Sequence, residues 1–254
     1  MIDDLLIKIT FLSLLIPLFA TYVQAEKTAG PPAFAGSRQA IVVTSSNWNN
    51  SSATLQCYER RETDRPWTKV GEKIPLVIGR KGLGWGLGLH PSSPEGEPVK
   101  KEGDGKAPAG IFRLSAAFGY APPAALNRVR LPYLQATPDF LCIDDAASTH
   151  YNRIVDMKQT RADWKSSEDM LRKDDQYRLG IVVDHNANPV VPGKGSCIFM
   201  HIWAGPGKGT SGCTAMAADN LEALLYWLSP QAHPVLIQLP DSVYERERKA
   251  WELP

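Results

Sequence analysis

The chain has 254 residues, of which 43% are hydrophobic and 22% charged, a composition typical of a globular protein with a sizeable core. The formal net charge of +1 provides no basic field for counterion release, so we expect no nucleic-acid partner. Twenty glycines and twenty prolines favour a loop-rich and strand-rich chain and argue against a helical bundle.

Residues 1–25 are typical of an export signal. Ile9 to Val23 is almost wholly apolar, and Val23-Gln24-Ala25 places small residues where a signal peptidase cuts. An uncleaved membrane anchor is the alternative, but a run of roughly 15 residues is shorter than the ~20 that span a bilayer, and Pro17 interrupts it. We therefore expect an exported protein that contacts a membrane only if this segment stays uncleaved.

Residues 26–39, which contain Pro31-Pro32, are expected to form a linker without a core of its own. From residue 40 the pattern changes to β-type runs separated by turn-forming residues. Strands are expected over residues 41–44, 53–58, 67–70, 74–78, 180–184, 196–203 and 235–239. The glycine-rich and proline-rich stretch 79–110 is expected to form surface loops, part of which line a site.

Helical patterns are scarce. Ser166 and Ser167 could cap a short helix that runs to Arg172. The stronger case is 219–228, where one face is apolar because leucines recur at helical spacing, and Pro230 ends it. These leucines are Leu221, Leu224, Leu225 and Leu228. We predict one domain over 40–240, followed by a charged tail over 241–254 that packs through Trp251.

Four cysteines could pair fully in three ways in an oxidising compartment: Cys57, Cys142, Cys197 and Cys213. A catalytic thiol would have to stay unpaired. If Cys213 is that thiol, one disulfide is possible among the other three cysteines, and the sequence leaves its pairing open.

Cys213 is the predicted nucleophile and His201 its predicted base. His201 lies on a buried-looking strand, and the glycine-rich loop 204–212 is long enough to fold Cys213 back onto it. A thiol of pKa near 8.5 needs a base to become a thiolate at neutral pH. The amides of Gly212 and Cys213 could together stabilise an oxyanion.

Other interpretations of these residues stay open. An isolated histidine on a strand is often a core residue bonded to a carbonyl. Gly195-Ser196-Cys197 makes Cys197 a weaker candidate nucleophile. His201, His185, Cys197 and Cys213 could in principle bind zinc, but no metal-ligand spacing is present, so we predict no metal.

Several motifs together resemble the L,D-transpeptidase (YkuD-type) catalytic-domain family. Its signature is a histidine, a variable gap and Ser/Thr-His-Gly-Cys, and His201 with Thr210-Ser211-Gly212-Cys213 matches this frame. Residues 102–112 are similar to the family's glycine-rich Thr-Pro-x-Gly-x-Phe element. Three stretches are similar to one branch of the family: Trp85-Gly86, Cys142-Ile143-Asp144-Asp145 and Tyr151-Asn152.

The resemblance implies a mainly β (α+β), β-sandwich-like catalytic domain with one or two short helices. It implies that Cys213 attacks the third-residue carbonyl of a peptidoglycan tetrapeptide stem and releases D-alanine. The acyl group would pass to an amine, giving a 3-3 cross-link or attachment of an envelope lipoprotein. The protein would act in the periplasm or cell envelope without a cofactor. Hydrolysis by the same site (an L,D-carboxypeptidase) and non-catalytic wall binding are the alternatives.

The resemblance also assigns supporting roles. The carbonyl of Ile202 would orient His201. The family's motif histidine is Ser211 here, and its usual arginine is Ala215, so stabilising charge would have to come from elsewhere, with His185, Arg153 and Lys208 as candidates. The residues predicted to bind substrate are Tyr151, Asn152, Arg153, His185, Trp203 and Lys208.

Overall fold

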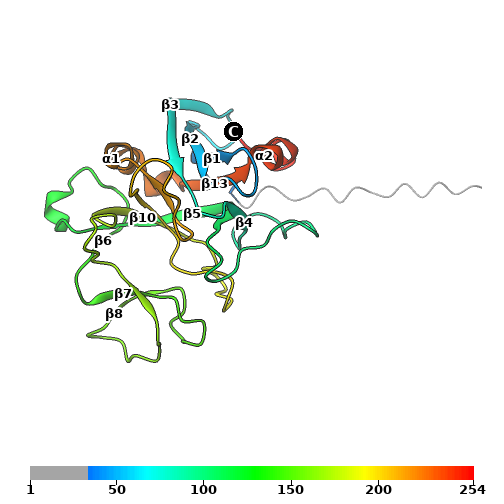
Figure 1. Ribbon diagram of the computed structural model, residues 1–254. Helices are drawn as coiled ribbons and strands as arrows, with labels where there is room; N and C mark the ends of the chain where they lie inside the picture. The colour runs from blue at the N-terminus through cyan, green and yellow to red at the C-terminus, as the bar shows by residue number, and fades with distance from the viewer. Residues whose placement is uncertain (1–33) are drawn as a thin grey trace, which may run out of the picture. The chain divides into compact units, whose positions relative to one another are not determined.

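The computed structural model describes residues 34–254 (Figure 1). The predicted export signal at 1–25 and most of the predicted linker at 26–39 lie outside these residues. Within the end of that linker, Phe34 is only 4% exposed and packs in the main core. Residues 34–39 therefore already belong to the folded domain.

A ten-stranded sheet forms most of the domain. Its order is β10-β11-β12-β3-β2-β1-β13-β5-β4, with β6 beside β5. Because β10 also pairs with β5, the sheet closes into a barrel-like ring. The mainly β, sandwich-like prediction is confirmed. The strands are β1 (Gln39–Ser45), β2 (Ser52–Glu59), β3 (Thr68–Val77), β4 (Leu83–Trp85), β5 (Ala107–Gly119), β6 (Tyr133–Gln135), β10 (Leu179–Val183), β11 (Phe199–Ile202), β12 (Thr214–Met216) and β13 (Val235–Pro240).

The parallel pair β1 and β13 forms the centre of this sheet, with Ile41 opposite Leu236 and Val43 opposite Gln238. β2 and β5 flank the pair on its outer sides. Strands covered on both faces consist of near-continuous apolar residues, and β1 and β13 are buried almost throughout. Their long-range pairing anchors the two ends of the domain to each other.

A second, three-stranded sheet has the order β8-β7-β9 and lies apart from the large sheet, at the bottom of Figure 1. Its strands are β7 (Phe140–Ile143), β8 (Ile154–Asp156) and β9 (Ser167–Asp169). The helix predicted over 166–172 is wrong, because its first half is β9. There, Glu168 pairs with Cys142 of β7, and this tertiary pairing overrides the local helical preference.

The helix predicted at 219–228 is confirmed as α1 (Ala218–Trp227), and its leucine face is buried. Residues 241–254 are more ordered than a tail, since they begin with α2 (Asp241–Glu247), whose Val243 and Tyr244 are buried. Trp251 packs against the main core, as predicted. The described residues also contain two 3-10 turns, η1 (Pro123–Ala125) and η2 (Pro230–Ala232). Within residues 34–254, no helix has the length and apolar character needed to cross a membrane.

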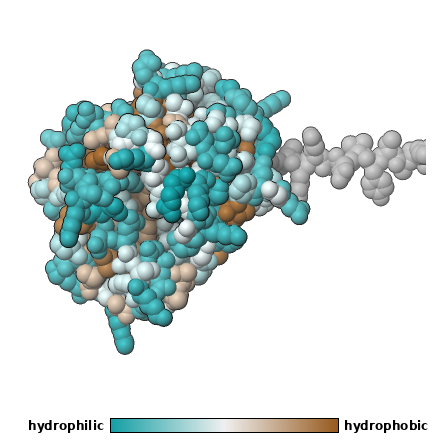
Figure 2. Space-filling model, viewed as in Figure 1, coloured by the Kyte–Doolittle hydropathy of each residue, from teal (hydrophilic) through white to brown (hydrophobic). Residues whose placement is uncertain are grey.

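The face of the molecule drawn in Figure 2 is mostly hydrophilic, with hydrophobic residues scattered over it and not gathered into one patch. Isolated apolar residues on a surface are ordinary. No single apolar patch on this face therefore marks a docking surface.

Candidate active site

Residues from both sheets line one cavity of about 600 Å³. The large sheet and its loops contribute His201, Ser211, Gly212 and Cys213, while the three-stranded sheet contributes Glu168. Another hollow of similar size lies beyond Lys100, but neither Cys213 nor His201 lines it. The first cavity is therefore the candidate active site.

The strands β11 and β12 place the two predicted catalytic residues together. They pair in parallel, with Met200 opposite Thr214, and Cys213 immediately precedes β12. The Phe199 N–H donates a hydrogen bond to Cys213 Sγ at 3.3 Å. Tyr177 packs its ring against His201 and makes a hydrogen-bond contact with Cys213, and all three line the same cavity, so the loop 204–212 returns Cys213 to the side on which His201 lies.

Two buried hydrogen bonds fix β12 to β13 and β5. Thr214 Oγ1 donates to Gln238 Oε1 at 2.7 Å, and Gln238 Nε2 donates to the Pro108 carbonyl at 2.9 Å. Gln238 is fully buried, so its amide needs both partners. The strand that follows the thiol is thus fixed to β13 and β5.

His201 is buried, with 5% of its surface exposed, and one of its ring nitrogens is engaged in a hydrogen bond. Its Nδ1 lies 2.8 Å from the Ile202 carbonyl oxygen, which can only accept, so Nδ1 carries the proton. Burial lowers the pKa of His201 to about 4, and the imidazole is neutral at pH 7. Nε2 consequently keeps its lone pair and can accept a proton.

The Cys213 thiol is also buried and neutral at rest. Burial, and after it the negative charge of Glu168, raise its pKa to about 12. The Phe199 N–H, the Tyr177 hydroxyl and the ammonium of Lys100 lower the pKa in the opposite direction. A neutral thiol beside a neutral imidazole needs proton transfer at the moment of attack, which is the work of a general base.

The predicted oxyanion donors are only partly available. Gly212 N–H donates to Thr210 Oγ1 at 3.1 Å, and Thr210 Oγ1 in turn donates to the Cys213 carbonyl at 2.6 Å. The amide of Gly212 is therefore occupied, whereas the Cys213 N–H makes no hydrogen bond to any residue of 34–254. The prediction that both amides serve as oxyanion donors is therefore wrong for Gly212. The Cys213 N–H is the one of the two that remains available.

Gly212 has a steric reason to be glycine. A Cβ at this position would lie 3.2 Å from the Lys106 carbonyl oxygen and 3.3 Å from Ile198 Cδ1. Both contacts are closer than ordinary van der Waals distance. A larger residue would push the turn, and the thiol that follows it, out of position.

Positive charge reaches the cavity from residues outside the sequence motif. Ser211 Oγ accepts a hydrogen bond from Arg80 Nη1 at 2.9 Å. Lys100 is 3% exposed, lines the cavity and donates to Asp104 Oδ1 at 2.7 Å. Arg80 thus contacts Ser211, the residue at the position of the motif histidine, and Lys100 adds a second cation to the cavity wall.

None of the three predicted charge donors lines the cavity. His185 is buried, and both of its ring nitrogens are engaged, with Lys194 O at 2.9 Å and the Leu87 amide at 3.2 Å. Burial lowers the pKa of His185 to about 4, so it carries no charge at pH 7. The side chains of Arg153 and Lys208 are exposed outside the cavity.

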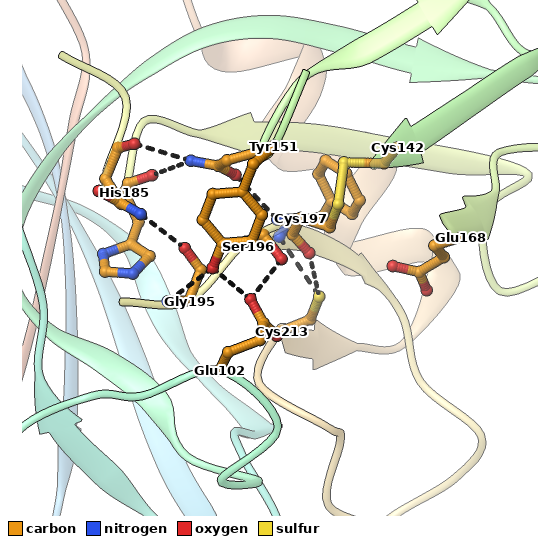
Figure 3. Close-up of a disulfide and its surroundings, with 12 residues drawn as sticks. Glu102, Cys142, Tyr151, Glu168, His185, Gly195, Ser196, Cys197 and Cys213 are labelled. Carbon is orange, nitrogen blue, oxygen red and sulfur yellow. Dashed lines mark hydrogen bonds between the residues drawn. A yellow bond between two sulfur atoms is a disulfide. The ribbon is translucent and has the colours of Figure 1, made fainter. Parts of the chain in front are cut away.

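The other predicted substrate-binding residues support the cavity from outside it. Tyr151 is 2% exposed, and its hydroxyl donates to Glu102 Oε2 at 2.5 Å (Figure 3). Asn152 Oδ1 accepts from the Cys197 N–H at 2.9 Å. Trp203 follows β11, and its backbone N–H donates to Met216 O. These residues position the cavity wall and do not line the cavity.

The open cysteine pairing is resolved by a disulfide between Cys142 and Cys197. Cys197 is therefore not a free thiol, which excludes it as the nucleophile. Its carbonyl lies 3.5 Å from Cys213 Sγ, on the side of the cavity shown in Figure 3. Cys57 is free but buried on β2, away from the cavity. Over residues 34–254, no three His, Cys, Asp or Glu side chains gather as metal ligands.

Five cavity or cavity-edge residues escaped the sequence analysis: Arg80, Lys100, Glu168, Arg172 and Tyr177. The Tyr177 ring packs edge-on against His201 with centroids 5.2 Å apart. None of the five belongs to a catalytic motif, and no local pattern distinguishes them from other charged or aromatic residues.

Comparison with known proteins bears on the same region. The sequence model of the L,D-transpeptidase catalytic domain (YkuD) matches residues 48–237, which include His201 and Cys213. No curated protein and no solved structure matches the chain.

Proposed function

Because the chain belongs to the YkuD family of L,D-transpeptidase catalytic domains, we propose that it transfers peptidoglycan stem peptides through a thioester on Cys213. The observation that carries this proposal is the shared cavity of Cys213 and His201, in which the imidazole is held by the Ile202 carbonyl.

In the first half-reaction, His201 Nε2 takes the thiol proton as Sγ bonds to the third-residue carbonyl carbon of a tetrapeptide stem. The Cys213 N–H donates to the oxygen on which negative charge develops. The carbon–nitrogen bond to D-alanine then breaks, and the imidazolium returns its proton to the leaving amine. The products are D-alanine and a thioester.

In the second half-reaction, an acceptor amine attacks the thioester carbon and gives a proton to His201. The carbon–sulfur bond breaks, and Cys213 recovers its proton. A stem-peptide amine gives a 3-3 cross-link, and an envelope lipoprotein lysine gives protein attachment. Water in place of the amine would make the enzyme an L,D-carboxypeptidase.

We place the protein in the periplasm or cell envelope. The predicted export signal supports this location, and so does the Cys142–Cys197 disulfide, because disulfides persist in oxidising compartments.

The test incubates the purified protein with disaccharide-tetrapeptides and resolves the products by mass. A dimer with loss of D-alanine supports transfer, and tripeptide alone supports hydrolysis. Cys213→Ala protein should be inactive, while Cys57→Ala, which removes the other free buried thiol, should keep its activity. If neither product forms with the wild-type protein, the proposal of a catalytic function is wrong.

A further inference from the structure

The three-stranded sheet brings carboxylates to the cavity that the proposed chemistry leaves unused. Glu168 lies on β9 and Asp144 directly follows β7, and both line the cavity that contains Cys213. Figure 3 shows the Glu168 carboxylate turned toward the Cys213 side of the disulfide. The negative charge of Glu168 also raises the pKa of Cys213, so this carboxylate opposes formation of the thiolate.

Each of these carboxylates has an oxygen without a protein partner. Glu168 Oε1 accepts from the Tyr177 hydroxyl at 2.6 Å and from Arg172 Nη1 at 3.2 Å. Its Oε2 accepts no hydrogen bond from residues 34–254. Asp144 Oδ1 is buried and also lacks a partner in this part of the chain. Glu168 is part-exposed to the cavity, so its free Oε2 can accept a hydrogen bond from a ligand there, whereas Asp144 contributes mainly its negative charge.

The charge on this wall is not balanced by the protein. Arg172 is the nearby cation, but Asp174 engages its Nε at 2.9 Å and its Nη2 at 2.5 Å. The Arg172 guanidinium is therefore shared by two carboxylates, Glu168 and Asp174, while Asp144, which also lines the cavity, forms no ion pair with residues 34–254. Lys100, which also lines the cavity, is already paired with Asp104. A cationic ligand would neutralise the remaining negative charge on this wall.

We propose that Glu168, together with Asp144, determines specificity by binding the side-chain ammonium group of the third residue in the donor stem. The proposal rests on the proposed transpeptidase function, in which that residue is a diamino acid acylated by Cys213. An ammonium group has three N–H donors and a positive charge, which match the unpartnered Oε2 of Glu168 and the surplus of negative charge to which Asp144 adds.

Binding of the ammonium also has a consequence for the thiol. The bound positive charge offsets the negative charge of Glu168, the carboxylate that disfavours the Cys213 thiolate. A stem with a free ammonium would thus bind more tightly and acylate Cys213 faster than the same stem with that group blocked.

The test measures binding separately from catalysis. Calorimetry on Cys213→Ala protein compares a tetrapeptide stem that carries a free side-chain amine with the same peptide acetylated on that amine. We expect the free amine to bind about 10- to 100-fold more tightly, the range of a charge-assisted hydrogen bond. Glu168→Gln in this background should remove most of the difference by weakening only the free-amine peptide.

Asp169→Asn is the matched control, because Asp169 is the exposed neighbour on the same strand and does not line the cavity. It should keep the full preference. Thermal melting verifies that Glu168→Gln is folded, and Glu168→Asp, which retains the charge, should restore part of the preference. Equal binding of the two peptides, or a preference that survives Glu168→Gln, would overturn the proposal.

Acylation of the wild-type protein is followed in parallel by intact mass. If the amine preference depends on Glu168 but no stem acylates Cys213, the proposed reaction is wrong and the ammonium subsite stands. If acylation occurs without any amine preference, the proposed reaction stands and the subsite is wrong. If Glu168→Gln leaves donor binding unchanged and reduces only the use of an acceptor amine, the assignment to the donor stem is wrong.

Discussion

Replacing both Cys142 and Cys197 by serine removes the covalent link between the three-stranded sheet and the segment that leads into β11. The bond joins β7 to the segment just before β11. That segment also supplies the carbonyl that contacts Cys213 Sγ. We expect this double variant to lower the stability of the domain and to loosen the sheet that carries Glu168.

The magnitude follows from the size of the closed loop. The two cysteines are 55 residues apart, and closing a loop of that length in the unfolded chain corresponds to about 4 kcal/mol in the chain-entropy model. For a domain of this size, about 4 kcal/mol lowers the melting temperature by about 8–16 °C. Native hydrogen bonds across the same boundary, such as Tyr177 to Glu168, remain in the variant.

The assay is thermal unfolding followed by circular dichroism, with and without reductant. Reductant should lower the melting temperature of the wild-type protein and leave the double variant unchanged. Cys57→Ala, which lacks a cysteine outside the disulfide, should respond to reductant as the wild type does. Amide exchange should accelerate over 140–170 more than in β1 and β13. A double variant that melts within about 2 °C of the wild type would refute the loop-entropy reasoning.

Three further outcomes are expected. Burial lowers the pKa of His201 to about 4 in the folded protein, against 6.5 in the unfolded chain. The free energy of unfolding should therefore fall as the pH drops from about 6.5 to about 4. Urea titrations at several pH values measure this fall, and His201→Asn should reduce it. Gly212→Val should lower the acylation rate at least about tenfold, with a small change in melting temperature, because the turn before Cys213 must move. An unchanged acylation rate would contradict the steric argument for glycine at this position. Thr214→Val should lower the free energy of unfolding by about 1–3 kcal/mol in denaturant titrations, since it leaves the buried Gln238 Oε1 without its donor. An unchanged free energy of unfolding would show that Gln238 finds another partner.

Local patterns were sufficient for several elements. The leucine spacing predicted α1, because a helical face depends on residues three and four positions apart. The apolar runs at 41–44 and 235–239 predicted β1 and β13, although their pairing with each other lies far beyond any local pattern. The runs at 67–70 and 74–78 were separated in the prediction but form the single strand β3.

Other predictions failed where a partner distant in the chain decides the outcome. Residues 166–172 have helical propensity, yet pairing with β7 makes the first half a strand. The amide of Gly212 was expected to be free, but the hydroxyl of Thr210 engages it. The charge expected from His185 is absent because burial keeps that imidazole neutral.

By itself the sequence determined the mainly β class and the helix α1, and it indicated a strand histidine followed by a loop cysteine, because each depends on residue types at short, regular spacing. Only the tertiary structure decided which cysteines are joined and that Arg80 contacts Ser211. It also brought the carboxylates of Asp144 and Glu168 to the wall of the Cys213 cavity. Those contacts join residues that are tens to more than a hundred positions apart, and their positions follow from the closure of the sheet and from burial, which no local pattern encodes.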